Sequence, residues 1–198
     1  ETALHCYLFQ AMESFNARYP NVHFKILNNS TKKSIHIVKE GNVDFAVVSA
    51  PFHIEKPLKK QILREYHDIL ISGKRYSELK GKQLSINQLS KYPWISLTSE
   101  AITRKFLNQY FEKNGLKFEP DIELATTDMI LPAVRHNLGI GFIPPEFAID
   151  DLDSEEIFEI HVQETFPERN ITLIYDTEYP QSIAAKEFLK FLSETTIL

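Results

Sequence analysis

Hydroxyl side chains stand where four of the predicted helices begin. They occur in four places along the chain: Thr2, Ser30 with Thr31, Thr98 with Ser99, and Thr126 with Thr127. Each is first a candidate N-cap, because an oxygen there accepts a hydrogen bond from a free backbone N–H and stabilises the helix by about 1 kcal/mol. Four such helix ends gathered around one cleft would instead form an anion site, since each presents free N–H groups and a positive dipole end. A small carboxylate, phosphate or sulfate is the expected occupant.

No pattern in the sequence indicates catalysis. The nucleophile motif G-x-S-x-G, the metalloprotease motif H-E-x-x-H and the phosphate-loop motif do not occur. The acidic pairs Asp150–Asp151 and Glu155–Glu156 are expected to lie in a polar loop and to be solvated, whereas a general acid needs burial. The run from Gly139 to Gly141 leads into a predicted strand, not a helix, so it is not a dinucleotide loop. Gly139 is expected to end the preceding helix in the left-handed conformation, and Gly141 to allow close packing.

Metal, redox and nucleic-acid sites are not predicted. The seven histidines are scattered and Cys6 is the one cysteine, so neither a metal-ligand cluster nor an internal disulfide is expected, and no cofactor is implied. The formal net charge is −5, and acidic neighbours dilute the best basic cluster, which is Lys56, Lys59, Lys60 and Arg64. This chain alone is therefore not expected to bind DNA phosphates. No apolar run of about 18 residues and no secretory signal is visible, so a cytoplasmic protein without membrane contact is expected.

Hydrophobic periodicity predicts helices and strands that alternate in two stretches. The first stretch has a helix over 3–19, a strand over 22–27, a helix from Ser30 to Gly41 and a strand over 45–48, which together indicate a parallel βαβ unit. Extended segments at 58–65 and 67–72 and a polar linker at 73–83 follow. The second stretch has strands at 94–97, 121–124 and 138–143, with helices from 102 and 127 between them. A strand at 171–175 and an amphipathic helix at 183–192 end the chain.

This pattern predicts an α/β protein of two βαβ-type lobes with a central cleft. The first lobe is expected to comprise residues 1–72 plus 176–198, because the final helix can return to it, and the second lobe residues 73–175. A cleft between two such lobes is the usual place for a ligand.

The first predicted helix is apolar on more than one side. Cys6 and Phe9 lie off the face that Leu4, Leu8, Met12 and Phe15 define. Either a partner subunit covers the second side or it packs within the lobe.

Five motifs follow one another in order along nearly the whole chain. They are Phe15-x-x-x-Tyr19-Pro20-x-Val22, Val38-x-x-Gly41-x-x-Asp44-x-Ala46-Val47, Leu89-x-x-Tyr92-Pro93-x-Ile95, Arg104-x-x-Leu107-x-x-x-Phe111-x-x-x-Gly115, and Asp128-x-x-x-x-x-Val134-x-x-x-Leu138-Gly139-Ile140-Gly141-x-Ile143-Pro144. As an ordered set they resemble the effector-binding domain of LysR-type bacterial transcriptional regulators. Two departures are Asn28, where glycine is frequent, and Lys74-Arg75-Tyr76, where His-Pro is often found.

The resemblance implies a fold like that of type 2 periplasmic binding proteins, with a small-molecule inducer in the cleft. The implied effector contacts are Thr2, Asn29, Ser30, Thr98, Ser99, Thr127 and Ile143, in agreement with the anion-site argument. The resemblance also implies a strand ahead of the first helix and an upstream winged helix-turn-helix domain, which alone would bind DNA. A homodimer through the first helix is expected, and a tetramer for the full-length regulator.

Three other functions remain open at this stage. A secreted solute-binding protein would share the architecture but carry an export signal. An enzyme on the same fold would need a reactive cluster, which the sequence does not show. A redox sensor of the two-cysteine kind would need a second cysteine beside Cys6.

Overall fold

The computed structural model describes residues 1–194, which form two compact units. Unit 1 contains His67–Glu168 together with Glu1, and unit 2 contains Thr2–Tyr66 and the segment that begins at Arg169. The predicted lobes were 1–72 plus 176–198 and 73–175; the observed divisions fall where β3 (Ile69–Gly73) joins the sheet of unit 1 and β9 (Arg169–Asp176) joins that of unit 2. Residues 195–198 of the predicted first lobe lie outside the described residues.

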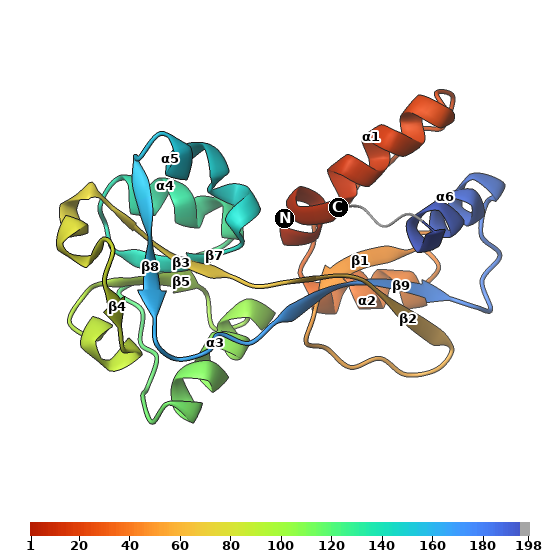
Figure 1. Cartoon of the computed structure of the whole chain (residues 1–198). Helices are drawn as coiled ribbons and strands as arrows, with labels where there is room; N and C mark the ends of the chain where they lie inside the picture. The colour runs from red at the N-terminus through yellow and green to blue at the C-terminus, as the bar shows by residue number, and fades with distance from the viewer. Residues whose placement is uncertain (195–198) are drawn as a thin grey trace. The chain divides into compact units, whose positions relative to one another are not determined.

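Unit 2 is built on an antiparallel sheet. Its remaining elements are a π-helical turn η1 (Leu4–Leu8), α1 (Phe9–Arg18), α2 (Thr31–Lys39), β1 (Ala46–Ser49), β2 (Leu58–Tyr66) and α6 (Ile183–Glu194). The three strands lie in the order β1-β9-β2, and β9 runs antiparallel to both neighbours (Figure 1). The predicted parallel βαβ unit is therefore wrong, although its helix and its second strand are present.

The predicted strand over residues 22–27 is also wrong. This segment belongs to no helix or strand, and its apolar residues Ile26 and Leu27 are 46% and 48% exposed. Its alternation of apolar and polar residues is typical of a strand, but a strand also needs a neighbour whose backbone completes the hydrogen bonds. No described strand pairs with it, and so the pattern alone does not produce a strand.

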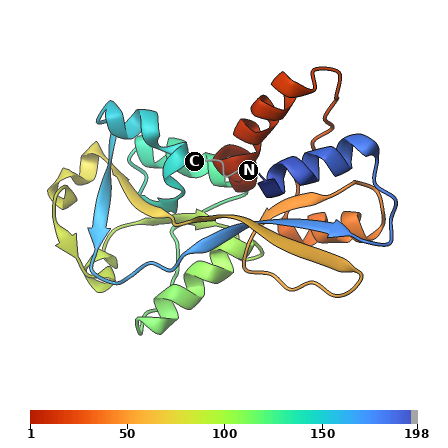
Figure 2. The same cartoon turned by 45° about the vertical axis from the view of Figure 1, so that its right-hand side comes forward.

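Aromatic packing holds the helices of unit 2 together. α1 and α6 lie side by side (Figures 1 and 2), and the Phe15 ring lies 4.9 Å from that of Phe188 and 5.5 Å from that of Phe191. Both rings meet Phe15 edge-on, the geometry that aromatic quadrupoles favour. The buried Tyr7 hydroxyl donates to the Leu192 carbonyl at 3.4 Å, and burial raises the pKa of Tyr7. α6 thus packs on unit 2, as predicted for the final helix.

Unit 1 contains a mixed sheet in the order β4-β8-β3-β7-β5-β6. Its remaining elements are η2 (Lys74–Leu79), β4 (Gln83–Leu84), η3 (Ile86–Leu89), β5 (Trp94–Leu97), α3 (Ile102–Lys113), β6 (Ile122–Leu124), η4 (Thr127–Met129), α4 (Ile130–Arg135), β7 (Ile140–Ile143), η5 (Pro145–Phe147), α5 (Ile149–Asp153) and β8 (Ile157–Val162). β5 is parallel to both β6 and β7, which confirms the second predicted βαβαβ stretch. The predicted linker at 73–83 is wrong, because it forms the 3₁₀ helix η2 and the strand β4.

The three parallel strands separate two hydrophobic cores. On one face Trp94 packs against Phe111, Phe118 and Phe142, with ring centroids 5.2 to 5.9 Å apart. On the other face a separate core of aliphatic side chains contains Ile95 of β5. Because successive residues of a strand point to opposite faces, the run Trp94–Leu97 supplies both cores.

Glycines let β7 approach β5 closely. A Cβ at Gly139 would lie 2.4 Å from the Pro93 carbonyl oxygen, and one at Gly141 would lie 3.0 Å from a methyl carbon of Ile130 and 3.1 Å from the Ile95 oxygen. Gly141 therefore allows close packing, as predicted. The left-handed residue that follows α4 is Asn137 (φ 58°), not Gly139. Asparagine tolerates this conformation better than other residues with a side chain, so the prediction chose the wrong position.

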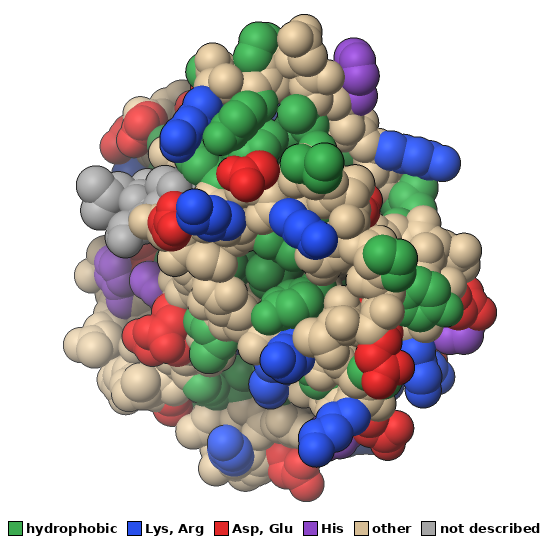
Figure 3. Space-filling view, turned by 90° about the vertical axis from the view of Figure 1, so that its right-hand side faces the viewer, with side chains coloured by type: hydrophobic (Ala, Val, Ile, Leu, Met, Phe, Trp, Pro, Cys, Tyr) green, Lys and Arg blue, Asp and Glu red, His purple; other side chains and the backbone are tan. Residues whose placement is uncertain are grey.

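The described surface mixes charges of both signs. On the face that Figure 3 shows, hydrophobic side chains form several separate groups with basic and acidic side chains between them. Within residues 1–194 no helix is long and apolar enough to cross a membrane. The same residues contain no group of three or more His, Cys, Asp or Glu side chains placed to hold a metal ion.

Arg104 fixes α3 to the ends of β5 and β6. Its side chain is almost fully buried; one guanidinium nitrogen donates to the Leu97 carbonyl at 3.0 Å and to Glu123 Oε1 at 2.6 Å, and Nε donates to Asn108 Oδ1 at 2.9 Å. The guanidinium carbon also lies 5.2 Å from the centre of the Phe118 ring. One side chain thus joins a helix, two strands and an aromatic core.

We expect Arg104→Met to destabilise unit 1 by about 1–3 kcal/mol, because the buried Leu97 carbonyl loses its charged donor. Thermal unfolding would show this as a fall of several degrees. Lys105→Met is the matched control, since Lys105 is the exposed next residue of the same helix. Equal melting temperatures for the two variants would contradict the assigned role of Arg104.

Candidate functional site

The carboxyl ends of β5, β6 and β7 meet at one edge of the unit 1 sheet. β5 and β6 pair from Ile95 with Ile122 to Leu97 with Leu124, and β5 and β7 pair Ile95 with Gly141, all in parallel. Residues that follow these strands must therefore lie close together. The predicted site residues at this edge are Thr98, Ser99, Thr127 and Ile143. We call this group the strand-end site.

Thr98 and Ser99 are exposed but do not cap α3. The N-cap of α3 is Ala101, which has no side-chain oxygen. The Thr98 N–H donates to the Leu124 carbonyl at 3.1 Å, and the Thr98 carbonyl accepts from Ala101 N–H at 3.0 Å, so a turn separates strand from helix. The prediction that these hydroxyls are N-caps is wrong for that reason. Among the described residues neither hydroxyl has a hydrogen-bond partner, and both can serve a ligand.

Thr127 and Ile143 are buried at the same edge. Thr127 is 5% exposed and lies inside the three-residue η4, where the N-cap is Thr126 and no side chain accepts a capping hydrogen bond. Ile143 is the last residue of β7 and is fully buried. Its side chain belongs to the aliphatic core, so only its backbone can face a ligand.

Two further side chains near this edge were not predicted as site residues. Arg104 donates to the Leu97 carbonyl, but its charge is neutralised by Glu123, so it positions the strand end. Ser96, two residues before Thr98, is 1% exposed, and its hydroxyl has no hydrogen-bond partner among the described residues. The motif beginning at Arg104 marked that residue in the sequence, whereas nothing marked Ser96.

In unit 2 the predicted site residues belong to two helix starts. Ser30 is the N-cap of α2, as predicted: its Oγ accepts from Lys33 N–H at 3.4 Å and its carbonyl accepts from Ser34 N–H at 2.9 Å. Asn29 precedes it and is partly buried. Thr2 is 7% exposed at the start of the first helix and makes no capping bond. The predicted cap at Thr2 is wrong because Ala3, the residue before η1, already has helical dihedral angles.

Nearly the whole chain matches a known family of domains. The family model described as the LysR substrate binding domain covers residues 1–196. The chain belongs to this family. The resemblance found in the sequence is thereby confirmed, and with it the effector-binding fold class. Two curated relatives are a probable RuBisCO transcriptional regulator of Cyanophora paradoxa and the regulator CysB of Burkholderia cenocepacia. The first relative is 24% identical, and the match covers 88% of this chain and 55% of the relative. The second is 26% identical, and the match covers 67% of this chain and 42% of the relative.

Solved structures of this LysR-type class have the same fold. The regulatory domain of Synechocystis PCC6803 CcmR in complex with 2-PG gives a TM-score of 0.82 at 19% identity, covering 96% of this chain and 91% of that one. The effector binding domain of QuiR in complex with shikimate gives a TM-score of 0.78 at 16% identity, covering 94% of this chain and 88% of that one. The curated relatives are named as transcriptional regulators, not as enzymes. The chain spans about half the length of those relatives.

We expect the hydroxyls of Ser30 and Thr98 to differ in their structural roles. Ser30→Ala removes the cap of α2, at a cost of about 1 kcal/mol, and should speed amide hydrogen exchange in α2 about fivefold. Thr98→Val removes no capping bond and should leave exchange in α3 unchanged. Hydrogen exchange followed by mass spectrometry measures both helices separately, and a comparable acceleration in α3 would show that Thr98 does support its helix.

Proposed function

We propose that this LysR-type effector-binding domain takes a small anion at the strand-end site of unit 1. A contact from Ser30 of unit 2 stays a prediction from the family resemblance. The observation that carries the proposal is the pair of exposed hydroxyls on Thr98 and Ser99, which make no hydrogen bond among the described residues. Hydroxyls that do not cap their own helix are free to donate to carboxylate or phosphate oxygens. The dipole of the 12-residue α3, which begins three residues after Ser99, favours negative charge nearby.

Two solved structures of the same fold support a small molecule as the ligand but do not identify it. The CcmR and QuiR domains are described with 2-PG and shikimate respectively. The buried Ser96 hydroxyl, which has no partner in the described chain, gives the same strand one more polar group that a ligand or water can satisfy. That the ligand lies between the two predicted lobes, touching Thr2 and Asn29 as well, stays a prediction from the family resemblance.

Transmission to DNA belongs to the proposed whole regulator. The chain covers 42% and 55% of the two curated relatives, and we infer that a DNA-binding domain outside this sequence contacts the promoter in the cytoplasm. Ligand binding would shift the population of domain conformations, which the assembled regulator would pass on. The alternative of a secreted solute-binding protein is not favoured, because the curated relatives are transcriptional regulators.

A thermal-shift screen tests the anion proposal. Sulfate, phosphate and shikimate serve as probes; a ligand at 100 times its dissociation constant adds about 2.7 kcal/mol, or roughly 5–11 °C for a domain of this size. We expect a saturable shift from one chemical class that Thr98→Val removes. Thr177→Val is the matched control, because Thr177 is an exposed threonine of unit 2 that donates only to the Pro57 carbonyl. A shift that both variants retain would place the ligand elsewhere.

We further propose a homodimer through the first helix. Cys6, Tyr7 and Phe15 of this helix are buried within unit 2, whereas Phe9 remains 48% exposed. Of the two residues that lie off the main apolar face, Cys6 packs within the unit and Phe9 remains for a partner. An exposed aromatic ring on a helix is a suitable anchor for a second copy.

We expect Phe9→Glu to convert the dimer to a monomer, because a dimer would bury the added carboxylates without partners. Light scattering after gel filtration gives the mass directly. Ile183→Glu is the matched control: Ile183 is 84% exposed on α6, so its charge would stay in water. A dimer that survives Phe9→Glu would exclude this helix as the interface.

A further inference from the structure

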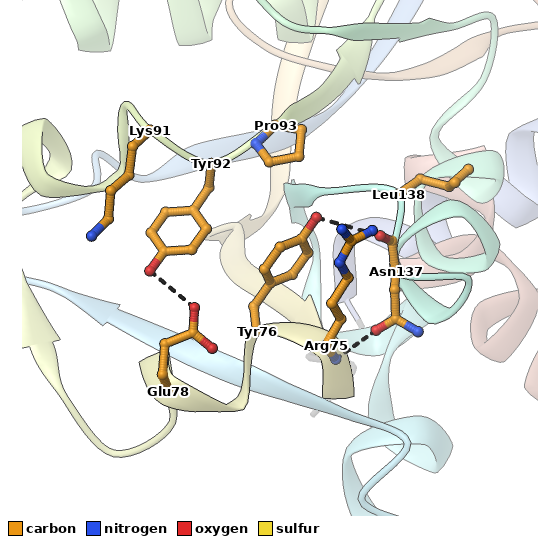
Figure 4. A pocket seen from close by; sticks show the side chains of 8 residues that line it. All are labelled: Arg75, Tyr76, Glu78, Lys91, Tyr92, Pro93, Asn137 and Leu138. Atoms are coloured by element: carbon orange, nitrogen blue, oxygen red, sulfur yellow. Dashed lines mark hydrogen bonds between the residues drawn. The ribbon is translucent and has the colours of Figure 1, made fainter.

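A pocket lies at the opposite end of the parallel strands from the strand-end site. It is a surface depression of about 510 Å³ within unit 1, lined by Arg75, Tyr76, Glu78, Lys91, Tyr92, Pro93, Asn137 and Leu138 (Figure 4). Pro93 directly precedes β5 and Leu138 stands two residues before β7, whereas Thr98 and Ile143 mark the other ends of the same strands. We call it the strand-start pocket. Its volume is in the range of small-molecule sites.

Backbone geometry holds the strand-start pocket in shape. Asn137 has a left-handed backbone, and its Oδ1 accepts from Arg75 N–H at 2.7 Å. Its carbonyl accepts a weaker bond from the Tyr76 hydroxyl at 3.4 Å. Gly73 makes this approach possible, because a Cβ there would lie 2.5 Å from the Val134 oxygen and 2.6 Å from Asn137 Oδ1. The start of η2 is therefore fixed against the end of α4 before any ligand binds.

Two positive charges at this pocket are not neutralised. Neither Arg75 nor Lys91 has a carboxylate within ion-pair distance among the described residues, whereas Lys74 and Lys80 of the same region pair with Glu156 and Glu155. Arg75 lies over the Tyr76 ring at 5.8 Å and Lys91 over the Tyr92 ring at 5.4 Å. Stacking on a ring orients a cation but leaves its N–H groups free for an anion.

The one carboxylate in the pocket already has a donor. Glu78 accepts from the Tyr92 hydroxyl at 3.1 Å (Figure 4), and partial burial followed by this carboxylate raises the pKa of Tyr92, so the hydroxyl keeps its proton at neutral pH. Two cations and one anion give the lining a net charge of +1. A single negative charge is therefore the best complement.

The remaining lining is flat and apolar. The Tyr76 and Tyr92 rings meet edge-on with centroids 5.6 Å apart, and Pro93 and the half-exposed Leu138 line the same space. Rings and a proline favour a planar hydrophobic group, since they offer broad contact without hydrogen bonds. Inorganic phosphate would leave these surfaces in water, and an uncharged ring would leave both cations unpaired.

We propose that the strand-start pocket is a second ligand site of this domain, for a planar aromatic carboxylate bearing one negative charge. The carboxylate pairs with the Arg75 guanidinium, assisted by Lys91, and the ring lies against Tyr92, Pro93 and Leu138. This site stands apart from the strand-end site in its residues and in its position on the sheet, so neither proposal depends on the other.

Titration with benzoate, followed by amide chemical shifts of the whole chain, tests this site. We expect saturable shifts at Arg75 and at residues 137–140. Acetate, which lacks the ring, and benzyl alcohol, which lacks the negative charge, should each bind about tenfold more weakly than benzoate. Arg75→Gln should weaken benzoate about tenfold, since a charge-assisted bond is lost, and Lys91→Gln should weaken it less.

Arg18→Gln is the matched control, because Arg18 lies over the Tyr19 ring at 5.5 Å in unit 2 and should not affect benzoate binding. Thr98→Val separates the two sites: it should remove binding at the strand-end site and leave the shifts at Arg75 intact. The proposal is overturned if benzoate gives no saturable shifts around Arg75, if acetate binds there as well as benzoate, or if Arg75→Gln and Arg18→Gln behave alike.

Discussion

The pairing of β7 with β5 is the constraint on which the rest of unit 1 depends. The Ile140 N–H donates to the Pro93 carbonyl at 2.9 Å, and Gly139 passes this carbonyl without room for a Cβ. A side chain at position 139 would separate the two strands at their start. Because the strands are parallel, their start and their end are fixed by the same register. The close approach of Gly139 to the Pro93 carbonyl therefore fixes the positions of both the strand-start pocket and the strand-end site.

The parallel strands of unit 1 were the most predictable part of the fold. The run Trp94–Leu97 was predicted with its observed bounds, because all four residues are buried and the strand is enclosed by two cores. The segment 22–27 has a better alternating pattern but forms no strand. A continuous run of apolar residues indicates directly that a strand is buried on both faces. Strand pairing depends on a distant backbone, as between β1 and β9, and local pattern carries no information about that partner.

The candidate site was predictable by residue type but not by role. Hydroxyls before helices were expected to be N-caps, yet only Ser30 acts as one among the four predicted starts. Thr98 does not cap α3 because its backbone N–H donates to the Leu124 carbonyl. This bond keeps the chain extended beyond β5, so that the helix begins only at Ile102. The left-handed position was assigned to Gly139 and not to Asn137 because glycine is the residue that most often ends a helix in this conformation.

These roles give the two groups of hydroxyls different binding properties. The Ser30 oxygen already accepts from Lys33 N–H, so its position is set, and its proton and second lone pair remain for a ligand. The Thr98 and Ser99 hydroxyls are free to rotate and must lose that freedom when they bind. Unit 2 therefore offers a preorganised donor, and unit 1 offers adaptable ones. Ordering the Thr98 and Ser99 hydroxyls therefore costs binding free energy at the strand-end site, whereas a ligand that contacts Ser30 meets an oxygen whose position is already set.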